Sequence, residues 1–107
     1  MTEVRYLFED DILVGFHLTG HSTAFAEDEV GHLVCASISS AAYMTANTVT
    51  EIVGADAVIE VNEEDGEMHL EVKSDFELAL PILLGFKLHM EQLSEQFTDY
   101  IKIISEV

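Results

Sequence analysis

Two pairs of short segments with alternating apolar residues most constrain the fold of this chain. The first pair spans residues 4–8 and 12–18, and three acidic residues separate its members. The second pair spans residues 58–61 and 68–72, with the sequence Glu63-Glu64-Asp65-Gly66 between them. An apolar period of two is typical of strands that bury one face, and short polar connections are typical of hairpins. We therefore predict two β-hairpins.

Each predicted hairpin is followed by a stretch with helical character. Residues 34–53 contain neither Gly nor Pro and precede Gly54, which predicts one helix that ends at this glycine. Apolar residues at helical spacing, preceded by the Ser74 and Glu77 spacing of a capping box, predict a second helix from Ser74 to about Phe97. Residues 100–104 fit either a strand or a further helical turn.

The order of elements is thus ββαββα, which indicates an α+β fold. Two hairpins cannot bury an apolar face alone, so we expect a two-layer sandwich, a mostly antiparallel sheet with two main helices on one face. A chain of 107 residues with 49% hydrophobic content can close one core, and residues 1–107 are predicted to form a single domain.

The charge of the chain restricts its partners. With 21 acidic and 4 basic residues, the formal net charge is −17, which would repel both nucleic acid and an anionic membrane surface. The same charge would attract a basic polypeptide. No segment has the roughly 18 consecutive apolar residues of a spanning helix, and residues 1–5 do not resemble a targeting signal, so we expect a cytoplasmic protein.

Cys35 and His21 are the residues with the clearest chemical potential. Cys35, the only cysteine, lies at the predicted start of the first helix, where the backbone amides favour a thiolate. His21 follows Gly20 at the end of the second predicted strand and opens an expected loop over residues 21–33. An imidazole close to the sulfur would accept its proton. Burial of Cys35 as a small apolar residue is the alternative interpretation.

The other histidines do not indicate a metal site. The five residues, His17, His21, His32, His69 and His89, lack the spacing of a helical ligand pair, and no second cysteine accompanies them. We therefore expect neither a metal nor a cofactor. His17 and His69 alternate with apolar neighbours and are predicted to be exposed.

Several segments together resemble one family. Gly20-His21, Ala26-Glu27 and Val34-Cys35-Ala36-Ser37-Ile38-Ser39 are similar to the signature of the bacterial ribosomal-processing cysteine proteases, the Prp family. The later segments Leu83-Leu84-Gly85-Phe86-Lys87-Leu88, Glu91-Gln92 and Tyr100-Ile101-Lys102-Ile103 are similar to its carboxyl-terminal helix and tail. The resemblance covers essentially the whole chain.

The resemblance implies a homodimeric cysteine endopeptidase that removes the N-terminal extension of the large-subunit ribosomal protein numbered twenty-seven. Cys35 would be the nucleophile and His21 the general base and acid. Ser39 matches the family's serine, His32 replaces an acidic residue of the family, and these two with Gly20 are expected to contact the substrate.

The oxyanion would be bound by the amides of Cys35 and its neighbour at the start of the helix. The basic precursor as substrate agrees with the acidic charge of this chain. The alternative function is a non-enzymatic acidic adaptor that binds a basic ribosomal protein without cutting it.

Overall fold

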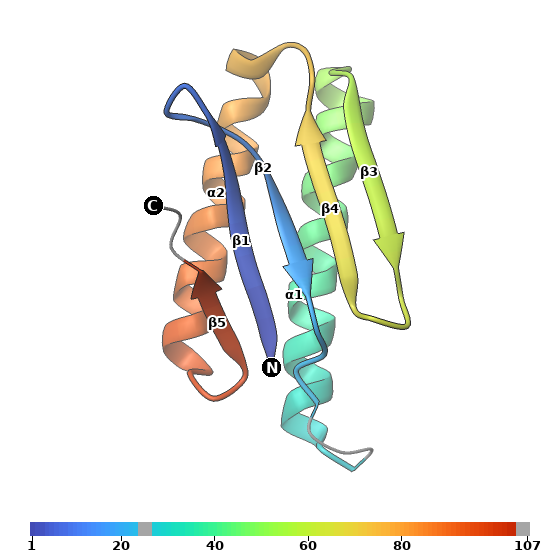
Figure 1. Ribbon diagram of the computed structural model, residues 1–107, viewed down its shortest axis with the longest axis vertical. Helices are drawn as coiled ribbons and strands as arrows, with labels where there is room; N and C mark the ends of the chain where they lie inside the picture. Colours follow the sequence, from blue (N-terminus) through green and yellow to red (C-terminus); the bar gives the residue numbers. More distant parts are fainter. Residues whose placement is uncertain (24–26, 105–107) are drawn as a thin grey trace.

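The computed structural model describes residues 1–23 and 27–104, and within them five strands form one sheet (Figure 1). The strands are β1 (Thr2–Glu9), β2 (Ile12–Thr19), β3 (Ala57–Asn62), β4 (Glu67–Val72) and β5 (Ile101–Ile104). Their order across the sheet is β3-β4-β2-β1-β5, and only the β1–β5 pair is parallel. Both predicted hairpins are confirmed, and the tail whose type the sequence left open is a strand.

Both main helices lie on the same face of this sheet (Figure 1). The first, α1 (Glu29–Asn47), continues into a π-helical segment, η1 (Thr48–Val53), which ends at the left-handed Gly54 as predicted. The second, α2 (Phe76–Gln96), follows the second hairpin. The predicted α+β class and ββαββα order are confirmed, with β5 added at the end of the chain.

The core forms where the apolar residues that alternate along the strands pack against the two helices. Val4, Phe16 and Leu70 point toward the helices and are almost completely buried. The rings of Phe16 and Phe86 stack with their centroids 4.1 Å apart, which joins β2 to α2. Stacked aromatic pairs stabilise a core beyond the area that they bury. This packing fixes the position of α2 relative to the central strands.

The predicted start of the first helix is wrong by about one and a half turns. The helix begins at Glu29 rather than Val34 because Asp28 caps it, with its Oδ1 accepting the backbone N–H of Gly31 at 2.9 Å. Gly31 suggested a loop in the sequence, but its lack of a side chain serves packing, since a Cβ there would lie 2.8 Å from the Cα of Thr23. The expected loop over residues 21–33 is therefore shorter, and its residues 24–26 lie outside the described part of the chain.

The predicted capping box of the second helix is also absent. Asp75 is the N-cap of α2, with a φ of 51°, and its side chain makes no capping hydrogen bond. The Ser74 hydroxyl instead accepts a hydrogen bond from the backbone N–H of Asp56, the residue directly before β3, at 2.8 Å. Ser74 is thus used to join two segments that are distant in sequence.

His17 and His69 are partly buried, although the sequence predicted that they are exposed. They face each other on the sheet surface opposite the helices, with their Nδ1 atoms 2.9 Å apart. Neighbouring strands cover part of each ring, which the alternation within one strand does not reveal. Over the described residues, no group of three or more potential metal ligands occurs, and no helix has the length and apolar character to cross a membrane.

Candidate active site

Cys35 lies inside α1, in its second turn, rather than at the helix start predicted from the sequence. The favourable effect of a helix N-terminus on a negative charge fades within the first turn. In the interior of a helix, each backbone amide donates to the carbonyl four residues earlier. The amides of Cys35 and Ala36 therefore lack the free position at a helix start from which we expected them to bind an oxyanion.

A different backbone amide faces the sulfur. The N–H of Ser22 donates to the Sγ of Cys35 at 3.1 Å. The hydroxyl of Ser22 makes separate contacts: it hydrogen-bonds with that of Thr2 at 2.7 Å and donates to the carbonyl of Tyr100 at 3.2 Å. Ser22, which the sequence did not single out, thus supplies the backbone donor next to the sulfur that we had expected from the helix end.

The position of His21 depends on the glycine before it. Gly20 has a φ of 87°, and a Cβ there would lie 2.5 Å from the carbonyl oxygen of Met1. Its N–H donates to the carbonyl of Asp65 at 3.0 Å, in the turn between β3 and β4. Only glycine combines this conformation with such a close approach. The chain therefore leaves β2 in a direction that brings His21 next to the β3–β4 turn.

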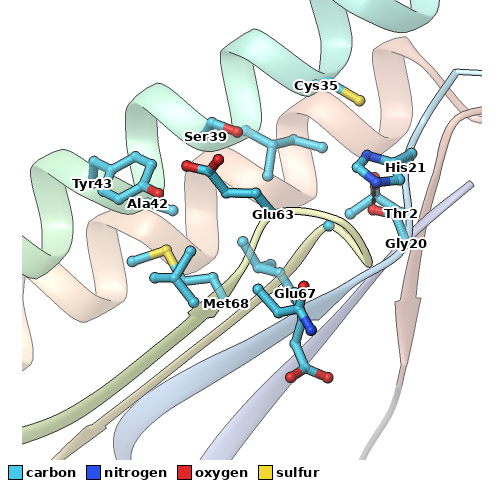
Figure 2. Close-up of a pocket in the computed structure, with 15 residues that line it drawn as sticks. Thr2, Gly20, His21, Cys35, Ser39, Ala42, Tyr43, Glu63, Glu67 and Met68 are labelled. Atoms are coloured by element: carbon cyan, nitrogen blue, oxygen red, sulfur yellow. Dashed lines mark hydrogen bonds between the residues drawn. The ribbon is translucent and has the colours of Figure 1, made fainter.

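Cys35 and His21 line the same pocket, one from α1 and one from the segment after β2 (Figure 2). Their hydrogen bonds go to different partners, because the Nε2 of His21 lies 2.8 Å from the carbonyl oxygen of Glu64 while the sulfur accepts from Ser22. The imidazole is exposed, whereas Cys35 is half-buried. The sulfur is therefore not buried in the core, and it lies in the same pocket as the ring.

The pocket itself is mainly apolar with an acidic side. It has a volume of about 250 Å³ and lies between α1 and the β3–β4 hairpin. Glu63 and Glu67 line it from the hairpin, and Figure 2 shows Tyr43 and Met68 at some distance along the pocket from Cys35. Its apolar lining consists of Leu18, Ile38, Ala42, Tyr43, Val61 and Met68. Such a lining suits one apolar side chain of a bound peptide.

The three further residues singled out in the sequence lie in different places. Ser39 is one turn after Cys35 on the same face of α1 and lines the pocket, as does Gly20. His32 is exposed in the first turn of α1 and does not line the pocket. The structure thus brings Ser39 and Gly20 to Cys35 and His21, and leaves His32 outside.

Comparison with models of known protein families gives one match. The family model described as "Cysteine protease Prp" matches residues 1–102. No match was found among curated proteins.

Several solved structures share the fold. The ribosomal processing protease Prp of S. aureus with a covalently linked product peptide is 18% identical with a TM-score of 0.82, and with a substrate peptide it is 16% identical with a TM-score of 0.85. Both alignments cover 99% of this chain and 100% of the other. A protein of Streptococcus mutans is 19% identical with a TM-score of 0.84, covering 99% of this chain and 96% of its own.

Proposed function

The chain belongs to the cysteine protease Prp family, and we propose that it is an endopeptidase with Cys35 as nucleophile and His21 as general base and acid. The observation that carries this proposal is the shared pocket, because it brings a half-buried thiol and an exposed imidazole to one apolar cavity. Thiol-dependent peptide hydrolysis requires a nucleophile and a base that can reach it, and a shared pocket allows this.

The reaction would proceed in two stages. The thiol proton passes to the ring of His21, and the sulfur attacks the carbonyl carbon of the scissile bond. His21 then returns the proton to the leaving amine, which departs with the C-terminal product and leaves the N-terminal fragment as a thioester on Cys35. A water molecule gives a proton to His21 and hydrolyses the thioester, and this proton returns to the sulfur. We propose that the amide of Ser22, 3.1 Å from the sulfur, donates to the oxyanion that forms next to the sulfur.

The proposed substrate is the N-terminally extended precursor of a basic ribosomal protein, the one numbered twenty-seven in the large subunit. The S. aureus structure that resembles this chain is described as a ribosomal processing protease. The net charge of −17 and the glutamates beside the pocket favour a basic polypeptide, and the apolar lining favours a large apolar residue next to the cleaved bond. Ser39 would contact the peptide backbone from α1. We further propose a cytoplasmic homodimer, by analogy with the family.

The experiment is to incubate the purified protein with the extended precursor under reducing conditions and to record intact masses. We expect a shortened product with the wild type, and none with Cys35→Ala or His21→Ala. An intact precursor would overturn the proposed protease activity.

The adaptor alternative predicts a different pattern. An adaptor would bind the precursor without shortening it, and both variants would bind as well as the wild type. Measuring both the mass of the precursor and its affinity for the three proteins separates these outcomes: shortening by the wild type alone supports the protease, and equal binding without shortening supports the adaptor.

A further inference from the structure

The β3–β4 turn contacts both the imidazole of His21 and the backbone of Gly20 before it. The Nε2 of His21 lies 2.8 Å from the carbonyl oxygen of Glu64. The N–H of Gly20 donates to the carbonyl of Asp65, and the Cα of Gly66 lies so close that a Cβ there would be 3.1 Å from the Nδ1 of His21. The imidazole is therefore held by the main chain of a turn that is 43 residues away in sequence.

The contact with Glu64 determines which nitrogen of the ring carries a hydrogen. A carbonyl oxygen accepts only, so the nitrogen next to it must donate. In a neutral imidazole, one nitrogen carries a hydrogen and the other accepts. With the hydrogen on Nε2, the lone pair that can take a proton is on Nδ1. A base whose second nitrogen is held by a third group is the usual arrangement of a nucleophile–base pair.

We propose that the main-chain carbonyl of Glu64 is the group that orients His21, so that Nδ1 is the atom that takes the proton of Cys35. This inference rests on the proposed protease function. When the ring becomes positively charged, the carbonyl dipole stabilises the hydrogen on Nε2.

Asn62 is the positioning residue that maintains this carbonyl. Its Oδ1 accepts the backbone N–H groups of Glu64 at 3.1 Å and of Asp65 at 3.4 Å. Its Nδ2 donates to the carboxylate of Asp65 at 3.0 Å. An asparagine that hydrogen-bonds to the backbone two residues later fixes the shape of a turn. Loss of this side chain would leave the Glu64 carbonyl free to turn away from the ring.

The test uses the full chain with three substitutions in β3. Asn62→Ala removes the acceptor, Asn62→Asp keeps an acceptor oxygen, and Glu60→Ala is the control, because Glu60 is an exposed residue of the same strand that does not line the pocket. Two measurements are made on each protein: the nitrogen–proton spectrum of the histidine rings, assigned with His21→Ala, and the rate at which iodoacetamide alkylates Cys35.

We expect the hydrogen on Nε2 of His21 in the wild type and in Glu60→Ala, and a mixture of both tautomers in Asn62→Ala. Alkylation should slow by about 10-fold in Asn62→Ala and recover at least in part in Asn62→Asp. A hydrogen on Nδ1 in the wild type would overturn the inference, as would an unchanged tautomer in Asn62→Ala. Neither measurement needs a peptide, so failure to cleave the precursor would refute the protease function alone.

Discussion

Gly66→Ala, compared with Gly54→Ala, separates the cost of a strained backbone from the displacement of His21. Both glycines have positive φ, 61° at Gly66 and 75° at Gly54; Gly54 precedes β3, and Gly66 lies in the β3–β4 turn. A Cβ at Gly54 would have no heavy atom of another segment within 4 Å, whereas one at Gly66 would lie 2.6 Å from the carbonyl oxygen of Gly20.

The expected magnitudes follow from these contacts. Left-handed backbone costs a residue with a Cβ about 1–2 kcal/mol, and the lower entropy of the unfolded alanine chain offsets about 0.4–1 kcal/mol of it. Gly54→Ala should therefore lose about 1 kcal/mol and lower Tm by about 5 °C. In Gly66→Ala the backbone of Gly20 must also retreat, by about 0.8 Å to reach ordinary contact, and His21 moves with it. A displacement of this order costs up to about 10²-fold in rate.

The assay is thermal unfolding together with the rate of precursor cleavage. We expect both variants to unfold at lower temperature, with Gly66→Ala the less stable, and only Gly66→Ala to lose activity, by about 10- to 100-fold. Full activity in a folded Gly66→Ala, or equal losses in the two variants, would refute the view that the β3–β4 turn positions His21.

Three further predictions concern the rest of the fold. Burial raises the pKa of Tyr6, as does the nearby Glu91, so stability from its neutral form is present below about pH 10 and is lost as the pH rises above it. Tyr6→Phe, which lacks the hydrogen bond to the Lys87 carbonyl, should be about 1 kcal/mol less stable than the wild type at pH 8. The free energies of unfolding of the two proteins, measured with denaturant, should become equal by about pH 11. Ser22→Ala should lose about 1–2 kcal/mol in the same assay, because two hydrogen bonds of a buried hydroxyl disappear, and Cys35 should keep its alkylation rate within a few-fold since the Ser22 amide remains. Light scattering should give twice the mass of one chain, and a monomer at all concentrations would contradict the proposed homodimer.

The strands could be predicted from the sequence because their evidence is local. Alternating apolar residues and short acidic turns specify each hairpin, and both appear where they were expected. The start of α1 could not be predicted in the same way, because Gly31 interrupts the helical pattern for a reason that lies in another segment, the backbone of Thr23. The local sequence pattern thus identified both hairpins and both helices, and tertiary contacts decided where α1 begins.

The site could be predicted only in part. Cys35 and His21 stand out by residue type, and both line one pocket. The contacts of Ser22 with the sulfur and of Glu64 with the imidazole involve backbone atoms 13 and 43 residues away. Any residue type supplies a backbone amide or carbonyl, so no feature of the side-chain sequence indicates these partners.

The central claim is that Cys35 attacks the peptide bond, and its most direct test is the mass of the protein during one turnover. Excess protein is mixed with the extended precursor, the reaction is stopped with acid at short times, and intact masses are recorded. We predict a transient species heavier by the N-terminal fragment less one water, mapped to Cys35 and absent in both Cys35→Ala and His21→Ala. Cleavage that continues in Cys35→Ala without any such species would contradict the account.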